Sequence, residues 1–304
     1  MLPVNDEEQG SDMDQLATDG PNAEQIEYWN HVSGDRWVEM GDVIDAQIAP
    51  LGEAAMERAR ITPGERVLDV GCGCGQTTLE LATRVGAGGS VVGLDLSNPM
   101  LARARERASH ADLANVEFQQ ADAQVYEFDA AGFDLLFSRF GVMFFSSPID
   151  AFTNLLSALR PGGRLVFVAW QELLRNPWMH LPIVAASKHL PPGGPPPDAN
   201  APGPFAFASR ERVEAILRES GFVNIQHESL ERDLLVGGGR PLDETVEFLA
   251  RLGPAGAALR EAGAELRSDI MSEIRRVIEP FHKHDGVHMP SATWIVSAER
   301  PTPG

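Results

Sequence analysis

Three glycines and one carboxylate fall within seven residues, in an arrangement that can bind a polar ligand. Residues 69–75 read Asp-Val-Gly-Cys-Gly-Cys-Gly and lie between an apolar run and an amphipathic one. The glycines Gly71, Gly73 and Gly75 let backbone N–H groups approach a ligand, and the start of a helix adds unpaired donors. Asp69 would repel a pyrophosphate but can accept hydrogen bonds from an ammonium group or hold the turn. The stretch therefore predicts a site for a ligand with a cationic part.

Two further acids follow the next apolar runs of the chain. Asp95 comes directly after residues 91–94, about twenty residues beyond the glycines, where an acid in nucleotide sites accepts hydrogen bonds from ribose hydroxyls. Asp122, which precedes Ala123, follows a third run, and its carboxylate can accept a hydrogen bond from an adenine amino group. The three acids together indicate a nucleoside that carries a cationic tail.

The elements that position these residues alternate between strands and helices. Short apolar runs predict strands at 67–70, 91–94, 116–119, 133–138 and 164–170, and amphipathic stretches predict helices at 77–85, 99–108 and 148–159. This βαβα pattern is typical of a Rossmann-like α/β fold with a doubly wound, mostly parallel sheet. The carboxyl ends of parallel strands meet at one edge, so we expect the three acids to converge there.

The rest of the chain predicts additions to this core. We expect a disordered acidic tail at 1–22, a helical lid at 23–62, and a main domain at 63–304 with cap insertions at about 175–208 and 237–281. Within the main domain, the patterns predict a helix at 209–219, a strand from 223, helical segments over 242–278, and a last strand at 293–298. The Pro-rich stretch 190–204 predicts a loop.

Charge and composition narrow the classes of partner. The formal net charge is -19 over 304 residues, which disfavours nucleic acids and anionic membrane surfaces as partners. No apolar run is long enough for a transmembrane helix, so we expect no membrane insertion. Cys72 and Cys74 are the two cysteines, which suits a reducing compartment and predicts the cytoplasm. Two thiols without a second pair make a poor zinc site, so we predict no metal.

Residues 66–170 resemble the class I S-adenosylmethionine-dependent methyltransferases. The resemblance is to small-molecule enzymes similar to the ubiquinone and menaquinone biosynthesis methyltransferases. It depends on ordered motifs: the Asp-x-Gly-x-Gly-x-Gly turn at 69–75, Asp95, Asp122, Phe133-Asp134, and Leu-Arg-Pro-Gly-Gly-Arg-Leu at 159–165. The last two strands of that family usually follow each other closely, whereas about forty residues separate them here.

The resemblance implies S-adenosylmethionine as the cofactor and assigns residues to its parts. The glycines of the turn would contact the methionine part, and Asp69 would hold the turn or the ammonium group. Asp95 would bind the ribose, Asp122 would meet the adenine edge, and Trp37 would close over the cofactor. The complete set of cofactor-binding residues that this implies is Trp37, Asp69, Gly71, Gly73, Gly75, Thr77, Asp95, Leu96, Met100, Asp122, Ala123 and Ser138.

Aromatic residues after the fourth and fifth strands predict a pocket for an acceptor, although the same residues can equally be core. Its predicted residues are Phe140, Met143, Phe144, Trp170, Trp178 and His180. His180 and His31 are candidate general bases, but a base is needed only if the acceptor must lose a proton, so no catalytic residue is assigned.

The predicted reaction is an in-line methyl transfer to a small, partly apolar metabolite, with O- or C-methylation favoured over N-methylation. Two alternatives stay open. A nicotinamide-dependent oxidoreductase would need a glycine where Gln76 stands. A protein that binds S-adenosylmethionine without methylating would share the same motifs. The acceptor, the methylated atom and the oligomeric state stay open as well.

Overall fold

A mixed sheet forms the centre of the computed structural model, which describes residues 16, 20–189, 198, 200–252, 256, 259 and 264–303. The strand order is β3-β2-β1-β4-β5-β8-β6, and β7 pairs with β8. The first five strands in this order are parallel, whereas β8 runs antiparallel to both of its neighbours β5 and β6. The strands are β1 Arg66–Val70, β2 Ser90–Asp95, β3 Val116–Gln120, β4 Phe133–Arg139, β5 Leu159–Trp170, β6 Val223–Val236, β7 His282–Lys283 and β8 Gly286–Glu299.

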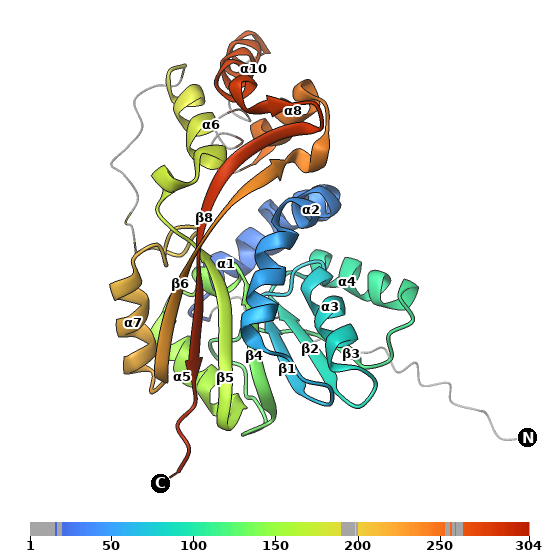
Figure 1. Ribbon diagram of the computed structural model, residues 1–304, viewed down its shortest axis with the longest axis vertical. Coiled ribbons are helices and arrows are strands. Elements are labelled where there is room, and N and C mark those ends of the chain that lie inside the picture. Colours follow the sequence, from blue (N-terminus) through green and yellow to red (C-terminus); the bar gives the residue numbers. More distant parts are fainter. Residues whose placement is uncertain are drawn as a thin grey trace, which may run out of the picture.

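This topology confirms the Rossmann-like, mostly parallel fold. From β1 the chain moves outward through β2 to β3, then returns to β4 beside β1 and moves the opposite way to β5. Because parallel crossovers are right-handed, the helices of these two halves cover opposite faces of the sheet (Figure 1). The helices of the core are α3 Gln76–Val85, α4 Asn98–His110, α5 Pro148–Ala158 and α7 Arg210–Glu219. The point where the direction reverses, between β1 and β4, is where such folds bind their ligands.

The central strands are buried on both faces, as their continuous apolar sequence requires. Leu68, Leu136 and Phe167 are fully buried in β1, β4 and β5. The predicted strands and helices of the core all form, within a few residues of the expected bounds. β5 begins earlier than expected, at Leu159, and its pairing with β4 shifts between Phe133 and Leu135.

Three helical segments precede the sheet, which agrees with the helical pattern predicted for 23–62. They are α1 Ala23–Glu27, the π-helical η1 Tyr28–Val32 and α2 Gly34–Ala59. Of the tail expected at 1–22, residues 1–15 and 17–19 lie outside the described residues. Asn22, placed in that tail, is buried and hydrogen-bonded to Asp122. Ordered structure therefore begins before residue 23, because the carboxylate of Asp122 gives Asn22 a buried partner.

The predicted insertions form a cap beyond the carboxyl edge of the sheet. Its helices α6 Pro177–Ser187, α8 Leu242–Arg251 and α10 Ala264–Ile278 contact one another. Figure 1 shows β6 and β8 running from the sheet up to these helices. β8 is longer than the strand predicted at 293–298, because Val287 and Met289 are buried beneath the cap, and β6 extends from the predicted start at 223 to Val236. Residues 190–197 and 199 of the Pro-rich stretch lie outside the described residues.

Asn176 anchors the cap to the sheet. Its side chain is fully buried, and its amide group donates to the carbonyls of Gln171, Glu172 and Ala292 at 3.3, 3.2 and 3.1 Å. Its Oδ1 atom accepts from the N–H of Ala292 at 3.0 Å.

Short helical turns complete the chain: η2 Val142–Phe144, η3 Leu173–Arg175, η4 Gly237–Gly239 and η5 Glu279–Phe281. Among the described helices, none has the length and apolar composition to cross a lipid bilayer.

Candidate functional site

The glycine turn connects β1 to α3 and packs against the end of β4. Gly71, Gly73 and Gly75 all have positive φ, at 70°, 55° and 82°. A Cβ atom on Gly71 would lie 2.6 Å from the Cα of Gly141, so the two backbones touch at the reversal point of the sheet. A Cβ atom on Gly75 would lie 2.8 Å from the Cβ of Ala104 in α4. Packing therefore requires Gly71 and Gly75 here, whatever the turn binds.

Asp69 lies beneath this turn with one oxygen satisfied and the other free. Its Oδ2 atom accepts from the hydroxyls of Thr77 and Thr78 at 2.6 and 2.7 Å, whereas the fully buried Oδ1 atom has no partner among the described residues. Burial raises the pKa of Asp69 to about 6, against the opposing effect of the two threonine hydroxyls and Arg139. A buried carboxylate oxygen without a partner is costly, and a cationic group would satisfy it. Thr78 was not predicted from the sequence.

Asp95 joins the end of β2 to the glycine turn. Its Oδ2 atom accepts from the N–H of Gly73 at 2.7 Å, and its Oδ1 atom accepts from the N–H of Ser97 at 2.9 Å. Burial raises the pKa of this carboxyl, and the backbone hydrogen bonds oppose that effect. Each carboxylate oxygen can accept a second hydrogen bond, so the pair retains capacity for two ligand hydroxyls.

Asp122 is hydrogen-bonded to Asn22, a residue that the sequence analysis did not assign to the site. The amide nitrogen of Asn22 donates to both oxygens of Asp122, at 2.8 and 2.9 Å, and the N–H of Gln124 donates to Oδ1 at 2.9 Å. The Oδ1 atom of Asn22 accepts from the N–H of Ser146 at 2.9 Å. Asn22 stands at the cap position of α1, where asparagine ordinarily bonds to its own helix. It bridges the segment after β3 and the loop before α5 instead.

The segment after α1 lies between two loops of the carboxyl edge. The side chain of Asn30 donates to the carbonyl of Leu96 at 3.1 Å and accepts from the N–H of Asn98 at 2.9 Å. The ring of Trp29 contacts Trp37 and Phe144 edge-on, with centroids 5.7 and 5.3 Å apart. Residues 22–37 thus connect the β2–α4 loop to the β4–α5 loop.

The remaining predicted cofactor residues lie around the turn. The hydroxyl of Ser138 is buried and donates to the carbonyl of Val70 at 2.7 Å, so it joins β1 to β4. The Cε atom of Met100 would lie 2.9 Å from a Cβ on Gly73. Ala123 is buried and Leu96 is half-buried. The structure therefore gathers the predicted residues at one edge, and several of them have structural partners of their own.

An aromatic stack begins one residue before Gly141. Phe140 lies parallel to Trp170, with ring centroids 4.2 Å apart and an interplanar angle of 6°. Trp170 in turn contacts Trp178 at 5.4 Å. Phe140 has a positive φ of 66°, which is costly for a residue other than glycine, and such strain concentrates at functional sites. The Nε1 atom of Trp178 is buried and has no partner among the described residues.

The predicted acceptor residues separate into two groups. Phe140, Trp170 and Trp178 form the aromatic stack, whereas Phe144 contacts Trp29 instead. Met143 is almost completely buried in the hydrophobic core. Two histidines were candidate bases: His180 is half-buried on α6, whereas the side chain of His31 is 68% exposed, with its Nε2 atom 3.7 Å from Oε2 of Glu27.

Both cysteines of the turn are buried thiols. Burial raises the pKa of Cys72 well above its ordinary value and the pKa of Cys74 to about 12. The Sγ atom of Cys72 would lie 3.0 Å from a Cβ on Gly93, so the side chain fills space beside β2. Both thiols therefore stay protonated near neutral pH and contribute packing.

A buried ionic network supports the turn from the side of α2. Asp45 accepts from Arg139 at 2.7 Å and from Arg107 at 2.8 Å, and the two guanidiniums are 8% and 15% exposed. Arg107 also donates to the carbonyl of Cys74 at 2.9 Å. Sequence patterns did not indicate this network, because its members lie on α2, α4 and β4, far apart in the chain.

Comparisons with known proteins agree with this geometry. A family described as a methyltransferase domain matches residues 67–163. A ubiquinone/menaquinone biosynthesis C-methyltransferase of Pseudomonas savastanoi is 30% identical over 178 residues, which cover 56% of this chain and 70% of the relative. An aklanonic acid methyltransferase of a Streptomyces species is 33% identical over 120 residues, 40% of this chain and 54% of the relative. The chain spans little more than half of the first curated relatives it matches.

The fold also matches solved structures. A phosphoethanolamine N-methyltransferase of Haemonchus contortus, solved in complex with S-adenosyl-L-methionine, aligns with a TM-score of 0.53 at 22% identity. The alignment covers 83% of this chain and 53% of that one. At this identity the match supports the fold. The strand order, the glycine turn with its three acids, and the sequence relatives lead to the same conclusion: the chain belongs to the class I S-adenosylmethionine-dependent methyltransferase family.

Proposed function

We propose that this protein transfers a methyl group from S-adenosylmethionine to a small, partly apolar acceptor. The observation that carries the proposal is the contact between Gly71 and Gly141, where a Cβ on the first would lie 2.6 Å from the Cα of the second. Gly71 belongs to the turn expected to hold the cofactor, and Gly141 follows Phe140 of the aromatic stack. The contact brings a polar, acidic half-site directly beside an aromatic one, which suits a reaction between a charged cofactor and a flat or apolar acceptor.

Each acid has a separate task in this proposal. The free Oδ1 atom of Asp69 would pair with the ammonium group of the cofactor. Asp95, held by the N–H groups of Gly73 and Ser97, would accept from the ribose hydroxyls. Asp122 would receive the adenine amino group. The cofactor supplies a methyl group on a positively charged sulfur, and the chain aligns it with the acceptor and excludes water.

The aromatic stack supports an acceptor with a flat or apolar part. Phe140, Trp170 and Trp178 present large apolar surfaces, and aromatic faces also favour a nearby sulfonium charge. The names of two relatives, one for quinone biosynthesis and one for aklanonic acid, support a small molecule as acceptor. O- or C-methylation is favoured, with N-methylation as a further case. His180 on α6 is the better-placed candidate base, because His31 is largely exposed.

The first experiment measures cofactor binding. Titration calorimetry with S-adenosylmethionine and its demethylated product should give saturable binding, and NADH should give none. Asp95→Ala should weaken both interactions by at least about 1 kcal/mol, roughly fivefold, because a charged hydrogen-bond acceptor is lost. Glu106→Ala, an exposed acid on α4, is the matched control and should bind normally. Binding of NADH alone would contradict the proposal.

The second experiment separates methylation from cofactor binding without methyl transfer. The protein is incubated with cofactor carrying a deuterated methyl group and a panel of aromatic and lipid-like metabolites, peptides and nucleic acids. Mass spectrometry should find the label on a small molecule. Label only on peptide or nucleic acid would contradict the acceptor class, and cofactor turnover to another product would favour the non-methylating alternative.

We also propose that the protein works in the cytoplasm. The support is that both of its cysteines are free and buried, so a reducing compartment suits them. Cell fractionation followed by immunodetection should find the protein with cytoplasmic enzymes, and recovery in a secreted or membrane fraction would contradict this.

A further inference from the structure

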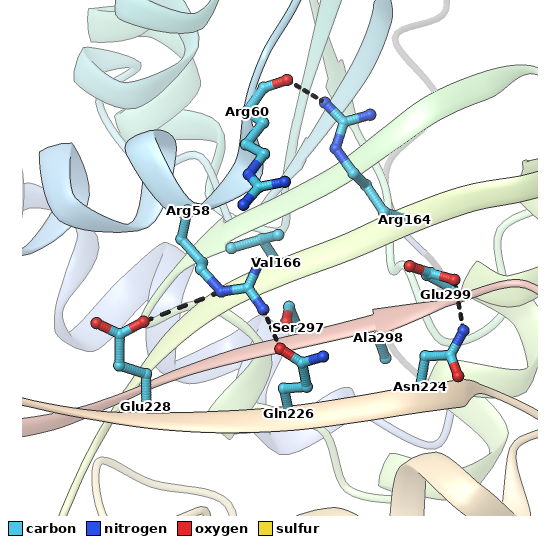
Figure 2. A pocket seen from close by; sticks show the side chains of 10 residues that line it. All are labelled: Arg58, Arg60, Arg164, Val166, Asn224, Gln226, Glu228, Ser297, Ala298 and Glu299. Atoms are coloured by element: carbon cyan, nitrogen blue, oxygen red, sulfur yellow. Dashed lines mark hydrogen bonds and ion pairs between the residues drawn. The ribbon is translucent and has the colours of Figure 1, made fainter.

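A hollow of about 540 Å³ lies away from the glycine turn. It opens between the end of α2, the middle of β5, the beginning of β6 and the end of β8 (Figure 2). Its lining is mostly polar and comprises Arg58, Arg60, Arg164, Val166, Asn224, Gln226, Glu228, Ser297, Ala298 and Glu299. Its volume is within the range of pockets that hold metabolite-sized ligands.

The hollow is displaced from the three acids across the strands of the sheet. Val166 of β5 is paired with Phe137 of β4, and Phe137 is paired with Asp69 of β1, so Val166 lies level with Asp69 but two strands away. The lining includes neither the glycine turn nor any of the three acids. A ligand in the hollow would therefore occupy a site separate from that of the cofactor and acceptor.

Two of its three guanidiniums are fixed by neighbours. Arg164 donates to both oxygens of Glu65 at 2.8 Å and to the carbonyl of Ala59 at 2.6 Å. Arg58 donates to Oε1 of Gln226 at 2.5 Å, and its Nε atom lies 3.9 Å from a carboxylate oxygen of Glu228. These contacts hold both side chains along the wall of the hollow, and Arg58 keeps donors that point into it (Figure 2).

Arg60 differs from the other two. Within the described part of the chain, its guanidinium makes no ion pair and no hydrogen bond, and Figure 2 shows it extending toward Arg58. Its backbone carbonyl accepts from Arg164 at 3.4 Å. Two guanidiniums that face each other repel, and an anion between them would remove that repulsion.

The backbone of Arg60 is in a conformation that favours glycine. Arg60 ends α2 in the left-handed conformation, with φ 50° and ψ 53°. Glycine is the usual residue at this position, because any Cβ is strained there. A glycine at position 60 would therefore remove the side chain without cost to the backbone.

Two carboxylates share the lining with the guanidiniums. Glu228 is 61% exposed and lies 3.9 Å from Arg58, and Glu299 accepts from the side chain of Asn224 at 2.7 Å. Among the three guanidiniums, that of Arg60 has no carboxylate partner within the described part of the chain. The hydroxyl of Ser297 adds a further donor to the lining. In a chain of formal net charge -19, three guanidiniums around one hollow are a local feature and not part of a generally basic surface.

We propose that this hollow is a binding site for a phosphorylated small molecule. The phosphoryl group lies between Arg58 and Arg60, where two guanidiniums can donate to its oxygens, and Ser297 and Gln226 contact the rest of the ligand. Guanidinium groups suit this role, because their fork of N–H donors matches the geometry of a phosphoryl group.

The experiment titrates the whole protein with pyrophosphate and with inorganic phosphate at constant ionic strength, measured by calorimetry. Saturable binding is expected, tighter for pyrophosphate. Arg60→Gly should weaken it at least tenfold without lowering the melting temperature, because glycine suits the left-handed position. Arg58→Gln should weaken it similarly. Arg218→Gln, on the exposed face of α7, is the control and should bind as the unmodified protein does.

Three results would overturn the proposal. The first is the absence of saturable binding, with only the response that equal ionic strength of sodium chloride gives. The second is equal affinity of the unmodified protein and the Arg58→Gln, Arg60→Gly double variant. The third is an equal loss of pyrophosphate and S-adenosylmethionine binding in that double variant, which would place both ligands in one site.

Discussion

The amide nitrogen of Asn22 lies 2.8 and 2.9 Å from the two carboxylate oxygens of Asp122, across a sequence separation of one hundred residues. Both side chains are buried, and the carbonyl oxygen of the same amide accepts from the N–H of Ser146. One short side chain therefore connects the segment before α1 to the segment after β3 and to the loop before α5. It fixes the carboxylate expected to recognise adenine and the segment expected to close over it.

Asn22→Ala should weaken the binding of S-adenosylmethionine five- to tenfold, about 1 to 1.4 kcal/mol, because Asp122 and residues 22–37 lose their common anchor. Titration calorimetry measures the affinity, and limited proteolysis should show faster cleavage before α2. Gln25→Ala, another amide on the same segment, is the matched control. Tighter binding by Asn22→Ala would show that Asn22 competes with the cofactor for Asp122.

Gly71→Ala should lower the free energy of unfolding by about 3 kcal/mol and abolish cofactor binding. The new Cβ would lie 2.6 Å from the backbone of Gly141, and one of the two turns must move. Gly64→Ala is the control, because Gly64 also has positive φ but open space around it, and it should cost only about 1 kcal/mol. Urea denaturation of both variants measures the difference. Equal losses would show that the close approach is unimportant.

The carboxyl of Asp69 should make stability depend on pH. Its pKa is about 6 in the folded protein and near its ordinary 3.8 in the unfolded chain. Between these values the folded state binds more protons, so the free energy of unfolding falls as pH rises from about 4 to about 6. About two pKa units correspond to about 3 kcal/mol, as an order of magnitude. Denaturation at several pH values should show this decline to be smaller in Asp69→Asn.

The same carboxyl should make cofactor binding depend on pH in the opposite direction. Only the ionised form of Asp69 attracts an ammonium group, so affinity for S-adenosylmethionine should rise as pH increases from 5 to 7. Asp69→Asn should bind more weakly at pH 7 and lose most of this rise. If the variant keeps the whole rise, another group is responsible, with Asp95 the first to examine.

Asp45→Ala should destabilise the protein by about 3 kcal/mol, because Arg139 and Arg107 would lose the carboxylate they share in a mostly buried position. Asp42→Ala is the matched control: it also removes a partner of Arg107, but its side chain is 76% exposed, and the cost should be about 0.5 kcal/mol. Thermal and urea unfolding measure both. Comparable losses would show that burial of the network is irrelevant.

The sequence predicted the elements whose signals are local. A glycine turn between an apolar run and a helix, and an acid at the end of each strand, need only a few neighbouring residues to be recognised. Asp69, Asp95 and Asp122 therefore appeared at the predicted edge. Periodicity also found α8 and α10 of the cap, because each has its own apolar stripe. The helix α6 was not predicted, because its apolar residues are not confined to one face.

Local sequence patterns do not indicate partners that meet only after folding. Asn22 and Asp122 are distant in the chain, as are Asp45 and Arg139, and a polar residue shows nothing of its partner before the fold is known. The residues predicted to line the acceptor pocket do not all lie together, for a similar reason. Phe144 contacts Trp29 of the N-terminal segment, and this contact exists only in the folded chain. β8 was predicted too short, because its first half packs against the cap helices and not against the core.

The ladder between β6 and β8 makes the cap continuous with the sheet. Pairing runs without a shift from Gln226 and Ser297 in the core to Val236 and Val287 beside the cap helices. A hinge motion of the cap would have to break this row of hydrogen bonds, whereas residues 22–37 are attached to the carboxyl edge by side chains alone. The two substrates of the proposed reaction would then enter by different routes. Residues 22–37 would move to admit the cofactor, and the rigid cap would select the acceptor by its shape.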